Sequence, residues 1–144
     1  MHPNMIELFS DTIAKTGHWL DEVMLATGHM EARHAYTVLR AVLHVLRDRL
    51  TVDEAVNLGA QLPMLVRGFY YEGWRPAGKP VKHRHKAEFL RLVAEEYTGV
   101  GQDELERAVR GVFKLLANHI TAGEIQHVRG QMPAELRELW DTVA

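Results

Sequence analysis

The chain has 144 residues, no cysteine and a formal net charge of −2, with 25% charged residues. This length suits one compact domain, and the lack of cysteine excludes disulfides and thiolate metal sites. The near-neutral charge argues against a surface dedicated to nucleic acid, and no apolar run reaches the roughly 20 residues of a membrane span. The first residues lack the profile of a signal peptide, so we expect a cytoplasmic protein.

The first helix is expected over SDTIAKTGHWLDEVMLATG, residues 10–28, with Gly28 placed to end it. A second helix follows, with an apolar stripe so wide that it predicts burial on more than one side. The residues expected to point inward are Ile13, Leu20, Val23 and Met24 in the first helix, and Val38, Leu39, Val42, Leu43, Val45, Leu46 and Leu50 in the second.

Two corners come next along the chain. Thr51-x-x-Glu54 has the spacing of a capping box, in which the threonine accepts from an amide of the new helix and the glutamate reaches back to the threonine amide. Pro63 ends this short helix, because proline lacks an amide proton and restricts the residue before it. Proline also suits the first turn of a following helix. The segment is therefore predicted to form a helix, a corner and another helix.

Residues 39–70 align with residues 109–140 at a constant offset of seventy, without a gap. Chance similarity rarely keeps register over such a length, so we interpret the match as an internal duplication. Leu65 opposite Glu135 is the clear mismatch. The identical pairs are Arg40 and Arg110, Val42 and Val112, Leu46 and Leu116, Thr51 and Thr121, Glu54 and Glu124, Gln61 and Gln131, Pro63 and Pro133, and Arg67 and Arg137.

The second unit has the same order of elements as the first. HKAEFLRLVAEEYTGVG, residues 85–101, predicts a helix that ends near Gly99, and a second apolar stripe, a Thr-x-x-Glu cap and a proline corner follow. The inward residues are Phe89, Leu90, Val93 and Tyr97 in the first of these helices, and Leu105, Val109, Val112, Phe113, Leu116 and Ile120 in the next.

These elements predict an all-α fold of about eight helices, as two tandem four-helix repeats packed about a pseudo-twofold axis. The expected units are residues 1–72 and 85–144, joined by residues 73–84 within one compact domain. Tyr70 and Trp140 occupy matching positions, and they lie either at the seam between the units or in the core of their own unit. The recurring arginines Arg40, Arg67, Arg110 and Arg137 are expected to bond helix-end carbonyls or acids.

The segment YEGWRPAGKPVKHRHK, residues 71–86, has no counterpart in the other unit and carries no acid between Glu72 and Glu88. Its glycines and prolines keep it out of regular structure. The cations lie where a helix begins, an end that prefers anions, so either an anion binds or a neighbouring carboxylate covers them; a solvated linker is the alternative. The candidate binding residues are Tyr70, Tyr71, Trp74, Arg75, Lys79, Lys82, His83, Arg84, His85 and Lys86.

Two Glu-x-x-His sequences, Glu31 to His34 and Glu124 to His127, would place both side chains on one helix face, as in di-metal carboxylate bundles. The two are not equivalent in the repeat, and Glu124 is expected to serve the capping box. His83 and His85 could share zinc, but no further ligand can be named. We therefore predict no metal ligands, no cofactor and no catalytic residue, and the enzyme reading is weak.

The string LRAVLHVLRDRLTVDEAVNLGAQLPMLVRGFYYEGWRP, with AKTGHWLDEVM before it and GKPVKHRHKAEFLRLV after it, resembles the bacterial proteins grouped as Domain of Unknown Function 2267. The resemblance covers nearly the whole chain. It implies an all-helical, cytoplasmic bacterial protein. It implies no activity, so no functional residue is carried over.

The function hypothesis is a non-catalytic protein-interaction module that contacts its partner through residues 70–86. The partner is expected to be another protein or a second copy of the chain, and no membrane is expected. The first alternative is a binder of nucleic acid or phosphate through the basic segment. The second is a metal-dependent enzyme with Glu-x-x-His ligands.

Overall fold

The computed structural model describes residues 2–28 and 31–141, and within these ranges all regular structure is helical. The expected all-α class and the eight helices are thus confirmed, with one added 3-10 turn. The elements are α1 (Pro3–Thr27), α2 (Ala32–Arg49), α3 (Val52–Ala60), α4 (Met64–Tyr71), α5 (Lys86–Glu96), α6 (Gln102–His119), α7 (Ala122–Gly130), α8 (Ala134–Arg137) and η1 (Glu138–Trp140).

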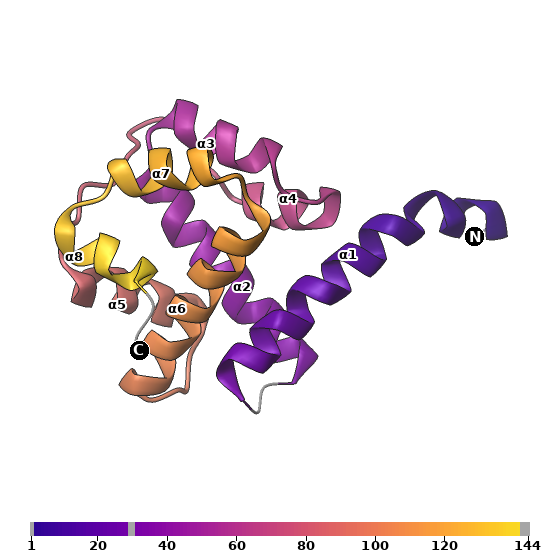
Figure 1. The fold of residues 1–144 in the computed structure, drawn as a ribbon, viewed down its shortest axis with the longest axis horizontal. Coiled ribbons are helices and arrows are strands. Elements are labelled where there is room, and N and C mark those ends of the chain that lie inside the picture. The colour runs from indigo at the N-terminus through magenta and orange to yellow at the C-terminus, as the bar shows by residue number, and fades with distance from the viewer. Residues whose placement is uncertain (1, 29–30, 142–144) are drawn as a thin grey trace.

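The helices α2 and α6 form the centre of the body, and the other helices surround them (Figure 1). Every residue of the two predicted apolar stripes is buried. Burying one such side chain stabilises a fold by roughly 1.5–3 kcal/mol, so these stripes account for much of the core. α5 also buries the four residues expected of it, namely Phe89, Leu90, Val93 and Tyr97.

The helix boundaries of the two halves keep the offset seen in the sequence. α2 and α6 begin and end seventy residues apart, as do α3 and α7. Thr51 and Thr121 cap α3 and α7 by accepting a hydrogen bond from the amides of Glu54 and Glu124, respectively. Pro63 and Pro133 directly precede α4 and α8, which confirms both predicted corners.

α1 is longer than expected. It begins at Pro3, with His2 as its N-cap, and ends before Gly28, whose φ of 91° few other residues adopt. Only its later turns pack on the body, through Thr12, Trp19 and Val23, while Leu20 and Met24 are half-buried. The prediction that Ile13 points inward is wrong, because it is 53% exposed, next to Thr12, which is buried.

Within the described residues, no helix is both long enough and apolar enough to cross a membrane.

Candidate functional site

We call residues 70–86 the joint. Its aromatic residues belong largely to the packed body. Tyr70 is fully buried, and its hydroxyl donates to the Ala55 carbonyl at 2.6 Å. Tyr71 is half-buried, with its ring 4.9 Å from that of Tyr70 and 5.4 Å from that of Trp74. Tyr70 therefore contacts its own half of the molecule. Trp140 does likewise, because it stacks on Phe113 with ring centroids 4.2 Å apart.

The second part of the joint is fastened to the end of α2. The Val81 amide donates to the Asp48 carbonyl at 2.8 Å, and Arg49 Nε donates to the His83 carbonyl at 2.9 Å. His83 is buried against Phe89. Burial and the nearby Arg49 guanidinium lower the pKa of His83, so its ring is held neutral and is part of the packing.

Carboxylates from the second half cover His85 and Lys86, the last two basic residues of the joint. Glu135 accepts from His85 Nδ1 at 2.8 Å and from the Lys86 amide at 3.3 Å. The hydrogen bond from His85 lowers the pKa of Glu135. The Lys86 ammonium lies 3.3 Å from Glu106 and 3.7 Å from Glu138. Glu135 is the residue that breaks the sequence match with Leu65, and its contacts give the physical reason for that departure.

Four cations of the joint have no carboxylate within ion-pair distance among residues 2–28 and 31–141. Arg75, Lys82 and Arg84 are exposed, and Lys79 is half-buried. The uncompensated positive charge of the joint is therefore confined to residues 75–84.

All four recurring arginines were expected to bond helix-end carbonyls or acids, and three of them do so. Arg40 lies 2.9 Å from Glu72 and 3.1 Å from Glu96. Arg67 donates to the Gly59 and Leu62 carbonyls, both at 2.9 Å. Arg110 donates to the Glu138 carbonyl at 2.9 Å and lies 3.0 Å from Glu106. Arg137 is exposed.

A cleft of about 370 Å³, with many charged residues in its lining, lies between α2, α5 and the joint. His44 lines it, with Nδ1 3.0 Å from Glu96 and Nε2 2.6 Å from the Phe69 carbonyl. A carbonyl oxygen can only accept, so Nε2 carries a proton. His44, Arg40 and Arg47 all use their nitrogens in bonds to α4, its C-terminal end or α5, which makes them structural supports of this wall.

The caps of α3 and α7 are completed across the interface between these two helices, which lie side by side (Figure 1). The Thr51 amide donates to Gln131 Oε1 at 2.9 Å, and Gln131 Nε2 donates back to Thr51 Oγ1 at 3.1 Å. Gln61 and Thr121 form the same pair of bonds, at 3.0 and 3.2 Å. The expectation that the glutamates reach back to the threonine amides is wrong, since glutamines from the opposite helix occupy those amides.

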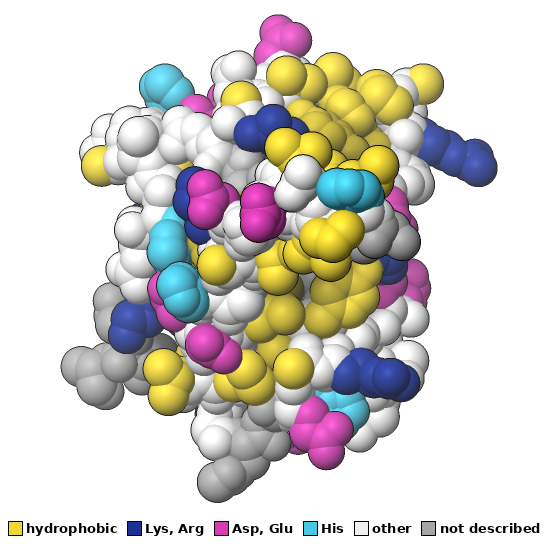
Figure 2. Space-filling view, turned by 90° about the vertical axis from the view of Figure 1, so that its right-hand side faces the viewer, with side chains coloured by type: hydrophobic (Ala, Val, Ile, Leu, Met, Phe, Trp, Pro, Cys, Tyr) yellow, Lys and Arg dark blue, Asp and Glu magenta, His cyan; other side chains and the backbone are white. Residues whose placement is uncertain are grey.

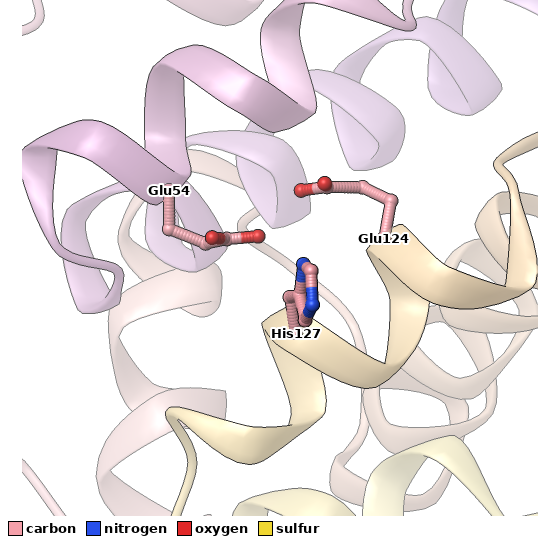
Figure 3. A group of neighbouring side chains, drawn as sticks. All are labelled: Glu54, Glu124 and His127. Atoms are coloured by element: carbon pink, nitrogen blue, oxygen red, sulfur yellow. The ribbon is translucent and has the colours of Figure 1, made fainter.

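Glu54 and Glu124 are thereby left free to face each other (Figure 3). Their side chains are only 7% and 8% exposed, and Oε1 of each has no hydrogen-bond partner among the described residues. Burial and the adjacent Glu54 carboxyl raise the pKa of Glu124 to about 7. The carboxyl pair therefore keeps a proton at pH values at which an isolated glutamic acid would have lost it.

His127 completes a group of three with the two glutamates. It lies one turn after Glu124 on α7, and one ligand atom from each of Glu54, Glu124 and His127 lies within 4.8 Å of the others. His127 is exposed, so this side of the group faces solvent. Glu31 and His34, the other Glu-x-x-His sequence, are both exposed at the start of α2. Sequence reasoning missed Glu54 because it assigned both glutamates to their own caps.

The projecting end of α1 carries an apolar surface that sequence reasoning also missed. Met5, Ile6, Phe9 and Ile13 are 46–53% exposed. Figure 2 shows hydrophobic side chains gathered on the face from which α1 projects. α4 adds Met64 and Leu65, and the Leu65 amide donates to Thr12 Oγ1 at 3.3 Å, which places the start of α4 beside α1. We name these six apolar residues the arm surface, and the part of α1 that carries four of them, residues 3–13, the arm.

Comparison with known proteins reaches most of the chain but not the arm. No curated protein matches the chain. Residues 16–139 match the family described as an uncharacterized conserved protein (DUF2267). The matched part includes the joint and the group of Glu54, Glu124 and His127, whereas the first thirteen residues of α1, Pro3–Lys15, lie outside it. Over this span the resemblance found in the sequence is confirmed, and the chain belongs to the DUF2267 family.

Proposed function

We propose that this protein acts by binding another protein chain, and that the bound chain is a second copy of itself. The observation that carries this proposal is the arm surface, an apolar helix face that the body leaves uncovered. The proposal replaces residues 70–86 as the leading contact surface, because Tyr70 and His83 lie inside the fold.

The arm continues a face of α1 that is already built for packing. Helical periodicity puts Met5 and Phe9 in line with Thr12, Trp19 and Val23, which are buried against the body. The face of α1 that packs on the body therefore continues toward the N-terminus, onto turns where its side chains are about half exposed. Each square ångström of apolar surface removed from water contributes roughly 25 cal/mol, so a chain that covered this face would gain stability.

A second copy fits this surface better than an unrelated partner. The arm surface combines a protruding helix with the apolar start of α4 beside it, and every copy presents both parts. In a twofold dimer the same patch serves on both sides, so the arm of each chain can pack where the other chain exposes Met64 and Leu65. The new contact would be continuous with the existing packing of α1 on α4.

Sedimentation equilibrium over a range of concentrations tests the proposal. The wild-type chain is expected to dimerise, and the double substitution Met5→Glu and Phe9→Glu is expected to give a monomer. Leu25→Glu is the matched control, because Leu25 is 83% exposed on the same helix but far from the arm; it should remain dimeric. A wild-type chain that stays monomeric throughout, or equal behaviour of the variant and the control, would overturn the proposal.

We also propose that the two halves of the body arose by duplication and pack about a pseudo-twofold axis that passes between α3 and α7. The matched helix boundaries support this, and so do the reciprocal Thr51–Gln131 and Thr121–Gln61 bonds. Gln61→Ala and Gln131→Ala should then destabilise the protein equally, each by about 0.5–2 kcal/mol, the usual effect of losing a helix cap. Unequal losses in urea unfolding would contradict an equivalent role of the two caps.

A second candidate function is anion binding through the joint, favoured by the exposed cations of residues 75–84. Filter binding of RNA and duplex DNA at low salt would test it. Replacement of Arg75, Lys79, Lys82 and Arg84 by glutamine should abolish binding, whereas Lys15→Gln with Lys114→Gln should not. Absence of binding by the wild-type chain at low salt would end this hypothesis.

A further inference from the structure

We propose that Glu54, Glu124 and His127 form a binding site for one divalent transition-metal ion, held between α3 and α7. The site is independent of the arm surface and of the proposed self-association. Figure 3 shows the three side chains directed toward a common point, Glu54 from α3 and the other two from α7.

The first argument is the state of the two carboxyl groups. Both side chains are more than nine-tenths buried, and in the part of the chain that the structure describes no residue outside the pair donates a hydrogen bond to Oε1 of either. An unpartnered buried polar atom costs free energy, and two carboxylates that face each other cost more if both are ionised. A divalent cation would accept lone pairs from both oxygens and would balance both charges.

The second argument is that the backbone around the site is fixed without help from the ligands. The bonds between Thr51 and Gln131 and between Thr121 and Gln61 tie the start of each helix to the end of the other. The two glutamates therefore do not cap their own helices, as the glutamate of a Thr-x-x-Glu capping box would do. Because these hydrogen bonds do not involve the ligands, they can hold the backbone of the site in place before an ion binds.

The third argument is reach. One ligand atom from each residue already lies within 4.8 Å of the others. Metal–oxygen and metal–nitrogen bonds of about 2.0–2.2 Å allow ligand atoms at most about 4.4 Å apart, so small side-chain rotations would close the site.

The donor set selects the class of ion. Imidazole suits zinc, iron, nickel and copper, whereas calcium and magnesium favour oxygen ligands alone. Two carboxylates with one imidazole therefore favour a first-row divalent ion. Since His127 is exposed, water can fill the remaining positions.

Calorimetric titration of the untagged, chelator-treated full chain with Zn²⁺ tests the site. One ion per chain is expected. His127→Ala and Glu124→Gln should each weaken binding by about tenfold or more, since even residues behind metal ligands have effects of this size. The matched control is His34→Ala, which removes the histidine of the other Glu-x-x-His sequence, where both residues are exposed; it should bind as the wild type does.

Two outcomes would overturn the proposal: no stoichiometric Zn²⁺ binding by the wild-type chain, or equal weakening by His34→Ala and His127→Ala, which would indicate unspecific binding to surface histidines. Circular dichroism checks that each variant is folded. If Glu124→Gln fails to fold, the exposed His127 still decides the question. The visible absorption of bound Co²⁺ gives a second readout, and it should be lost in His127→Ala and kept in His34→Ala.

Discussion

The two halves of the body agree in the elements that hold the fold, and they differ at several residues of the candidate sites. Both have a long apolar helix, a threonine cap completed by a glutamine, and a proline corner. His127 stands in the second half where Asn57 stands in the first, and Glu135 stands opposite Leu65. The first half alone has the projecting turns of α1. Most shared positions thus carry structure, with the two identical glutamates of the proposed metal site as the exception, and the departures between the halves direct attention to ligand, charge and contact sites.

The largest expected effect tests the shared core. Leu46 and Leu116 occupy matching positions and are both fully buried. Leu46→Ala and Leu116→Ala should each lower the free energy of unfolding by about 2–5 kcal/mol, because each leaves a cavity in a helix packed on several sides. Urea unfolding measures both. A large decrease in the free energy of unfolding for one variant with almost none for the other would contradict an equivalent role of the two positions.

A smaller effect should appear with pH in the metal-free protein. Burial beside Glu54 raises the pKa of Glu124 from 4.5 to about 7, so the folded state retains a proton that the unfolded chain releases. This contribution to stability is full below pH 4.5 and is lost as the pH rises through about 7. Urea unfolding at pH 5 and at pH 8, in the presence of a chelator, should show this loss of stability at the higher pH. His127 faces the carboxyl pair in both measurements. Glu124→Gln should reduce the difference in the free energy of unfolding between the two pH values. An unchanged difference would contradict the raised pKa of Glu124.

Asn57→His makes the first half resemble the second at the proposed metal site. If the axis between α3 and α7 relates the halves, the new imidazole would approach the carboxyl pair from the other side. Zn²⁺ should then bind more tightly by about tenfold, a typical effect of improving a metal site by one interaction. Val56→His, one position earlier on an exposed part of α3, is the control. Equal gains in both variants would argue against a symmetric site.

The smallest effect is expected for Glu135→Leu, which restores the match with Leu65. It removes the acceptor for His85 and for the Lys86 amide at the start of α5. All three groups are at or near the surface, so the loss of stability should be slight and should shrink further at high salt. Thermal unfolding at two salt concentrations measures it. A loss that does not depend on salt would show that Glu135 acts other than through charge.

Much of the fold could be predicted because its signals are local. The apolar stripes, Thr51, Thr121 and the two prolines depend on neighbours within a few residues, and each element formed where the sequence placed it. The start of α1 was missed because sequence reasoning looked for residues that face the core, whereas Met5 and Phe9 are about half exposed. Ile13 was misplaced because apolar spacing alone does not show which side of α1 turns toward the body; the neighbouring Thr12 is buried instead.

The candidate sites could be predicted only in part. The run of cations in the joint was visible, but which of them remain uncompensated depends on Glu135, Glu106 and Glu138, which come from another part of the chain. The partnership of Glu54 with Glu124 was hidden, because a Thr-x-x-Glu motif reads identically whether its glutamate or a distant glutamine completes the cap.

The sequence by itself determined the helices, their corners and the correspondence of the two halves, since backbone preferences and apolar spacing act over one or two turns. Only the tertiary structure decided which polar groups meet. The contacts of Gln61 with Thr121, of Gln131 with Thr51, and of Glu54 with Glu124 and His127 arise when α3 packs on α7. Hydrogen bonds and burial depend on distance in space, and packing sets that distance.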